Sequence, residues 1–264
     1  MIALLLAIAI SANQGSAVQL SFPNEPGVKS VDVAWNNRKV PAVLVADRWT
    51  TILGVDLDAK PGKQTADVLF TMDDGRVDRR EAVIEVEAKK YPTTELKVDD
   101  KYVELSKPDL ARANRETKET QGIYATITKE MLWDEPFSVP ISGENSGTNF
   151  GHRRVFNGQP RAPHAGADLR AKTGTPIHAT NRGRVVLAKN LFFTGNTVIL
   201  DHGLGVYSLY AHLSRIDVNR GDLVTNGQLL GLAGATGRVT GPHLHWGIVV
   251  QGARVDPFSL VDVR

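Results

Sequence analysis

Histidine and carboxylate residues at short spacings stand out in the second half of the sequence. His164 and Asp168 are four residues apart in HAGAD, His212 ends the segment YAH, and His243 and His245 alternate in HLH. The chain contains no cysteine, so a metal would have to be held by imidazole and carboxylate groups. Two histidines, one carboxylate and an open water position form a common catalytic zinc site, which lowers the pKa of bound water to about 7.

β-Strands are the elements that must position these side chains. Residues two apart in a strand project from the same face, so His243 and His245 can converge while Leu244 and Trp246 face the core. The same alternation predicts that Tyr210 and His212 lie together. Side chains that do not bind the metal could act as a general base and as a donor to the developing oxyanion. The helical H-E-x-x-H zinc motif is absent.

The other three histidines have ordinary structural interpretations. His202 lies in Asp-His-Gly, which is typical of a hairpin end, and His178 in PIHAT is expected to point outward from a strand. His152 receives the same interpretation, a surface or hydrogen-bonded residue. The sequence therefore predicts four histidines and Asp168 at the site.

The histidines lie in a predicted all-β domain at residues 141–264. All seven are in this region, together with 18 of the 24 glycines. Short apolar runs alternate with glycine-containing turns, which favours a compact, mostly antiparallel β-domain. The expected strands are 183–188, 197–201, 206–212, 229–232 and 243–250.

Residues 18–89 predict a second, smaller all-β domain. Six short β-favouring runs are separated by turn signals, Pro-Gly at 26–27 and 61–62 and Asp-Gly at 74–75. The expected strands are 18–22, 28–35, 40–46, 50–57, 66–71 and 82–86. A small sandwich of the immunoglobulin-like kind fits this pattern. The region contains no histidine and is interpreted as a spacer or docking module.

A connector at residues 90–140 is predicted to be partly helical. Ser106 to Asp109 reads as a helix start with proline in the first turn, and Gly122 is expected to bend or break the helix.

Residues 1–17 admit two interpretations. The apolar run 2–10 is too short to span a bilayer, and the small residues that follow it suit a cleaved secretory signal, although no basic residue precedes it. The alternative is a buried first strand. The signal peptide is the preferred interpretation.

The charge distribution narrows the classes of partner. The formal net charge of +2 provides no electrostatic case for nucleic acid. It is the sum of opposed regions, because residues 141–264 carry 13 Lys and Arg against seven Asp and Glu, whereas residues 18–140 carry 18 against 22. Such charges allow the two domains to dock. If docking inhibits the site, residues 141–264 alone should be more active than the full chain.

The C-terminal domain closely resembles the lysostaphin/LytM-type zinc metallopeptidases, which cut peptidoglycan cross-links. The matching segments span about residues 146–250 and include FGHRRVFNGQPRAPHAGADL, GTPIHATNRGRVV, GNTVILDHG, YSLYAHLS and GPHLHWGI. The resemblance implies that His164, Asp168 and His245 hold zinc. It further implies that His212 and His243 are the catalytic pair, with His243 preferred as the general base and the two roles exchangeable.

The resemblance leads to one leading function and several alternatives. The leading hypothesis is an exported zinc metalloendopeptidase, periplasmic or extracellular, that hydrolyses peptide bonds in peptidoglycan stem peptides or cross-links. The alternative is a non-enzymatic envelope adaptor, or an activator of a cell-wall amidase, that binds an envelope protein through residues 18–140. A secreted peptidase acting on glycine-rich proteins is a third hypothesis. Lipoyl and biotinyl carrier domains share some of the strand pattern, but a carrier role leaves the histidines unexplained.

Overall fold

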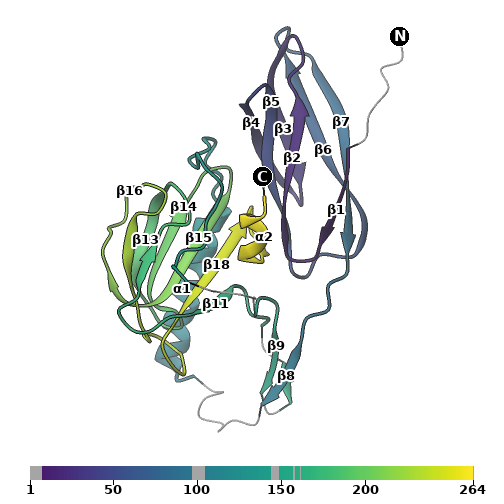
Figure 1. Ribbon diagram of the computed structural model, residues 1–264. Coiled ribbons are helices and arrows are strands. Elements are labelled where there is room, and N and C mark those ends of the chain that lie inside the picture. The colour runs from purple at the N-terminus through teal and green to yellow at the C-terminus, as the bar shows by residue number, and fades with distance from the viewer. Residues whose placement is uncertain (1–7, 97–104, 144–148, 157, 161, 264) are drawn as a thin grey trace.

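The computed structural model describes residues 8–96, 105–143, 149–156, 158–160 and 162–263, which form two β-domains linked by a small sheet and one long helix (Figure 1). The N-terminal domain is a β-sandwich. Its strands are β1 (Ile8–Asn13), β2 (Ser16–Pro23), β3 (Val28–Trp35), β4 (Arg38–Val45), β5 (Arg48–Val55), β6 (Gly62–Met72) and β7 (Val77–Glu87). The first half of β4 pairs with β3 and its second half with β5, so this strand passes from one sheet to the other.

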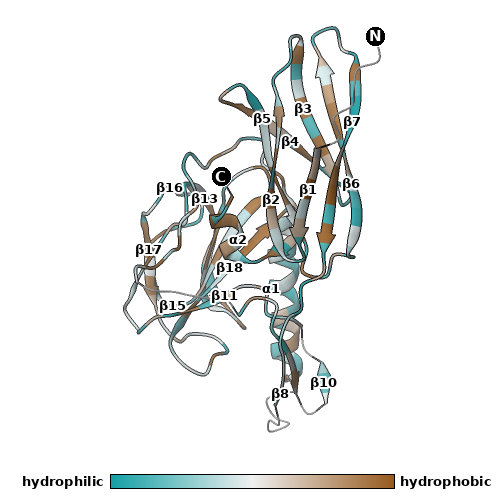
Figure 2. Cartoon of the chain, turned by 45° about the vertical axis from the view of Figure 1, so that its right-hand side comes forward, coloured by the Kyte–Doolittle hydropathy of each residue, from teal (hydrophilic) through white to brown (hydrophobic). Residues whose placement is uncertain are grey.

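Alternating apolar residues build the core of this sandwich. Val31, Val33 and Trp35 on β3 are buried, while the residues between them are partly exposed. The strands accordingly carry alternating hydrophobic and hydrophilic bands in Figure 2. Phe22 and Phe70 meet edge to face across the core with ring centroids 5.8 Å apart. The small sandwich expected from the sequence is therefore present.

Residues 8–17 take part in the sandwich, which corresponds to the second interpretation of the apolar N-terminal run. β1 pairs in parallel with β7 from Ile8–Ala82 to Asn13–Glu87, and Ala12 is buried. Ala17 is also buried, within β2. The predicted boundary after residue 17 thus falls inside β2, where Ala17 pairs with Gly54 of β5.

The connector forms a strand and a helix. β8 (Thr93–Leu96) pairs in parallel with β9 (Arg153–Phe156), which pairs with β10 (Gln159–Pro160). Helix α1 (Lys107–Ala125) starts at Ser106, whose hydroxyl accepts the Asp109 N–H, as the sequence predicts. The expected break at Gly122 is wrong: the helix continues through it and ends three residues later. No neighbouring atom lies within 4 Å of the position that a Cβ on Gly122 would occupy, so packing does not interrupt the helix there.

The C-terminal domain is built on a nine-stranded sheet, and its strand pairs are all antiparallel among the described residues. The central order is β11-β18-β15-β14-β13-β16, with β12, β17 and β19 attached at its sides. The bounds are β11 (Ala167–Arg170), β12 (Pro176–His178), β13 (Gly183–Leu191), β14 (Gly195–Asp201), β15 (Val206–Ile216), β16 (Leu223–Val224), β17 (Leu229–Ala233), β18 (His243–Val250) and β19 (Ala253–Val255), followed by helix α2 (Pro257–Val261). This confirms the predicted fold class. Phe137 packs into the core of this domain, so the core extends N-terminal of the predicted boundary at residue 141.

The two domains are in contact at the end of β18. Gln251 donates its amide to Ile52 O at 2.8 Å, and Arg254 forms an ion pair with Asp56 at 2.8 Å. Ala17 N donates to Ser259 Oγ at 2.9 Å beside α2. Within the described residues, no helix is long and apolar enough to cross a membrane.

Candidate metal centre

Three neighbouring strands bring the predicted metal ligands together. β18 lies between β11 and β15, with His245 opposite Asp168 on one side and opposite Ala211 on the other. His164 precedes β11. One ligand atom from each of His164, Asp168 and His245 lies within 4.8 Å of the others, the arrangement expected for a metal ion held by two imidazoles and one carboxylate.

Asp168 is the centre of this cluster. Its Oδ1 lies 3.1 Å from His164 Nε2 and 2.9 Å from His245 Nδ1. Burial by itself would raise the pKa of Asp168, but the hydrogen bonds from the two histidines hold this pKa well below its usual range. The pKa of His245 is lowered, mainly by burial. An ionised Asp168 carboxylate beside a neutral His245 imidazole is the protonation state that favours a divalent metal.

Asn149 holds Asp168 and His164 in place. Its side-chain amide donates to Asp168 Oδ2 at 2.9 Å, and its Oδ1 accepts the Asp168 N–H at 2.8 Å. Its main-chain oxygen lies 3.2 Å from His164 Nδ1, which leaves His164 Nε2 directed toward the cluster. Such outer contacts orient metal ligands. Sequence reasoning missed Asn149, because it lies in an irregular segment 15 residues before His164, where no spacing rule applies.

His212 and His243 line the same space without belonging to the metal cluster. Their ring centroids are 4.8 Å apart, and His243 Nε2 lies 3.5 Å from Asp168 Oδ1. Each ring directs Nδ1 to a main-chain carbonyl, Thr236 O for His212 and Gly241 O for His243, both at 2.9 Å. A carbonyl can only accept, so Nδ1 carries the proton and Nε2 of the neutral ring is free to take one. Burial lowers the pKa of His212 to about 4.

His212 reaches the site through an irregular backbone. Its φ is 64°, and the pairing register of β15 shifts just beyond it, between Leu213 and Arg215. The left-handed region costs a non-glycine residue about 1–3 kcal/mol and is enriched at functional sites. The prediction that Tyr210 lies beside His212 is therefore wrong. Tyr210 is fully buried on the core side, where its hydroxyl accepts the Thr180 N–H.

The other histidines lie outside the cluster, as the sequence suggested. His178 Nδ1 contacts Gly227 O at 2.9 Å. His202 is not at an exposed hairpin end: it is fully buried, with Nδ1 2.7 Å from Arg182 O and Nε2 2.7 Å from Ser208 Oγ. On β18, Leu244 and Trp246 are fully buried, which confirms the predicted alternation with His243 and His245.

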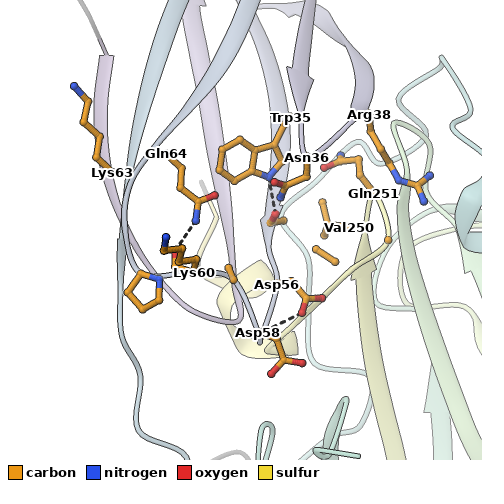
Figure 3. A pocket seen from close by; sticks show the side chains of 15 residues that line it. Trp35, Asn36, Arg38, Asp56, Asp58, Lys60, Lys63, Gln64, Val250 and Gln251 are labelled. Carbon is orange, nitrogen blue, oxygen red and sulfur yellow. Dashed lines mark hydrogen bonds between the residues drawn. The ribbon is translucent and has the colours of Figure 1, made fainter.

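A separate cavity of about 760 Å³ lies between the sandwich and the β18–β19 turn (Figure 3). Trp35, Asp56 and Gln251 are among the described residues that line it, and these residues include no histidine. The cavity touches β18 at Val250, five residues beyond His245, a separation on the order of 17 Å along a strand. The cavity is therefore separate from the cluster of His164, Asp168 and His245.

Comparison with known proteins matches this domain to a peptidase family. Residues 162–257 match the family described as Peptidase family M23. A crystal structure from Pseudomonas aeruginosa, of a protein assigned to the M23 peptidases, is 30% identical, covers 94% of this chain and 94% of its own, and superposes with a TM-score of 0.67.

Curated relatives match over the C-terminal domain. Peptidoglycan DD-endopeptidase ShyA of Vibrio cholerae is 44% identical over 110 residues, which are 41% of this chain and 26% of that protein. The DD-carboxypeptidase/endopeptidase Mpg of Neisseria meningitidis is 40% identical over 97 residues, 37% of this chain and 22% of that protein. The matched region thus spans about a quarter of the length of these relatives.

Proposed function

The chain belongs to peptidase family M23, and we propose on this basis that it is a zinc-dependent endopeptidase that hydrolyses peptide bonds in peptidoglycan stem peptides or cross-links. The observation that carries the proposal is the cluster of His164, Asp168 and His245 with two further histidines facing it. The activities by which the relatives are named, peptidoglycan DD-endopeptidases among them, support the substrate class. A location in the cell envelope, periplasmic or extracellular, follows from that substrate.

The donor set fits zinc. Two imidazole nitrogens and one carboxylate oxygen converge without cysteine, and the three side chains are 14 to 23% exposed, so the cluster is open to a substrate. Bound zinc would supply Lewis acidity and a water of lowered pKa. We assign His164 Nε2, Asp168 Oδ1 and His245 Nδ1 as the ligand atoms.

The remaining two histidines handle protons. We assign His243 as the general base, because its Nε2 lies closest to the metal ligands, 3.5 Å from Asp168 Oδ1. After accepting a proton at Nε2, the ring can donate that proton to the departing amine. His212 faces the same space, and its contact with Thr236 O keeps the ring oriented. We assign it to the tetrahedral oxyanion, to which His212 Nε2 donates a hydrogen bond once it has taken up a proton.

Two alanine substitutions test the assignment. His245→Ala should lose both zinc and hydrolysis of isolated sacculi, whereas His243→Ala should retain zinc and lose turnover by on the order of 10²–10⁴-fold. The measurements are metal content of the purified protein and mass spectrometry of released fragments, with and without a chelator. His178→Ala, outside the cluster, is the matched control and should resemble the unmodified protein. Full cleavage by zinc-free His245→Ala protein would contradict the proposal.

A further inference from the structure

Helix α1 lies outside the residues matched to the peptidase family, yet it contacts a loop next to the catalytic histidines. The loop spans residues 190–196 at the turn from β13 to β14. Glu116 of the helix accepts the Phe192 main-chain N–H at 2.6 Å. Arg112, one turn earlier, contacts Glu116 at 2.7 Å and Asn190 Oδ1 at 3.1 Å. The helix therefore holds both the main chain and a side chain of this loop.

Glu116 is well suited to such a contact. Its side chain is 17% exposed, whereas Arg112 is 41% exposed. Burial would raise the pKa of Glu116, but the Phe192 N–H and the Arg112 guanidinium together lower it, so the carboxylate is ionised at neutral pH. A hydrogen bond from a main-chain N–H to a partly buried carboxylate is stronger than one between neutral groups.

The same loop also contacts His212 and Thr236. Thr194 O accepts the His212 N–H at 2.8 Å, and Asn196 N donates to Thr236 Oγ1 at 2.9 Å. Thr236 O is the acceptor for His212 Nδ1. The main chain and the ring of His212 are thus each fixed by a residue of the loop or by a residue bonded to it.

Residues 193–195 pack closely against residues 236–238. A Cβ on Gly195 would lie 2.3 Å from the Thr236 carbonyl carbon, and one on Gly237 would lie 2.3 Å from Gly195 N. Phe193 O also accepts the Arg238 N–H at 2.9 Å. Because main chain packs directly on main chain here, a shift of residues 192–195 would be transmitted to Thr236 and to the His212 ring.

We propose that Glu116 and Arg112 of helix α1 are positioning residues, which act through loop 190–196 to hold His212 in its working orientation. The inference rests on the proposed function for its activity readout only. The left-handed backbone of His212 requires support from its surroundings, and this network supplies it. An error of about 1 Å in a catalytic group can lower the rate by about 10²-fold.

Variants of Glu116 provide the test. Glu116→Ala removes the acceptor, whereas Glu116→Gln keeps an oxygen that can accept the Phe192 N–H. We expect kcat on muropeptides to fall on the order of 10–100-fold in Glu116→Ala with KM changed much less, and to recover most of that loss in Glu116→Gln. Glu119→Ala is the matched control, because Glu119 lies on the same helix and pairs with the exposed Lys189 without contacting the loop main chain.

Hydrogen–deuterium exchange gives a readout that does not depend on activity. Peptides covering 190–196 and 210–214 should exchange faster in Glu116→Ala than in Glu119→Ala or the unmodified protein, while the zinc content stays unchanged. Unchanged exchange in both peptides, or a Glu116→Gln variant as slow in turnover as Glu116→Ala, would overturn the proposal. If the unmodified protein cleaves no muropeptide, the proposed function fails, and the exchange result still decides the role of Glu116.

Discussion

At the scale of single residues, the histidines differ in the groups that surround them. His245 and His212 face a shared space beside Asp168, whereas His202 is enclosed by the core near Phe137, with ring centroids 5.2 Å apart. Burial lowers the pKa of His202 to about 4. The same residue type therefore occurs both in the candidate metal centre and as a hydrogen-bonded core residue.

The buried His202 predicts a pH-dependent stability. The unfolded chain binds a proton at His202 below a pKa of about 6.5, while the folded protein resists it down to about 4, so the free energy of unfolding falls as the pH drops through this window. Through this one group, the free energy of unfolding is about 3 kcal/mol lower near pH 4 than above pH 6.5. Urea unfolding of metal-free protein at several pH values measures it.

A variant isolates this contribution from that of other groups. His202→Asn should unfold with a weaker pH dependence between pH 4 and 6.5 than the unmodified protein, because it removes the titrating ring. His178→Asn, which changes a partly exposed histidine, should keep the original slope. Equal slopes for all three proteins would refute the assignment.

At the scale of elements, both regular and irregular strand geometry bring the candidate site residues together. β18 supplies His243 and His245 by simple alternation, whereas β15 supplies His212 only through its positive φ. The loop 190–196 and helix α1 then support that strained residue. β1 illustrates the opposite case, in which an apolar run simply completes a sheet edge.

The contribution of β1 can be measured. Ala12→Asp places a carboxylate in the sandwich core and should lower the free energy of unfolding by about 2 kcal/mol. Ala9→Asp, on the exposed face of the same strand, is the control and should cost little. The intact mass of the purified protein, measured by mass spectrometry, first establishes that residues 1–17 are present. Equal stabilities of the two variants would show that β1 contributes nothing to the fold.

At the scale of the whole molecule, the sandwich docks at the end of β18 that lies away from the metal cluster. Asp56 accepts the Arg254 N–H at 2.7 Å and pairs with its guanidinium. Burial would raise the pKa of Asp56, but the hydrogen bonds from Arg254 and Asp58 lower it overall. The two domains thus contact each other through this ion pair, while inhibition of the site by docking stays a prediction. Among the described residues, the contacts of Asp56 with Arg254 lie beyond Val250, at the opposite end of β18 from His243.

The domain interface should be sensitive to Asp56. Asp56→Ala leaves the Arg254 N–H without its acceptor and removes one of the two carboxylates that pair with the Arg254 guanidinium, so it should destabilise the full chain by about 1–3 kcal/mol. Asp58→Ala is the matched control, since Asp58 is 52% exposed where it pairs with Arg254, and it should cost about 0.5 kcal/mol or less. Thermal and urea unfolding measure both. A larger loss in Asp58→Ala than in Asp56→Ala would contradict this view of the interface.

The sequence by itself determined the features that depend on residue type and short spacing. The alternation in HLH, the absence of cysteine and the capped start of α1 are local properties, and the structure agrees with them. Only the tertiary structure decided that the Asn149 side chain hydrogen-bonds Asp168, that Tyr210 points into the core while His212 faces the candidate site, and that α1 contacts the loop 190–196. These contacts join residues far apart in the chain or follow from one unusual φ angle. Such geometry results from packing between elements, which no local pattern encodes.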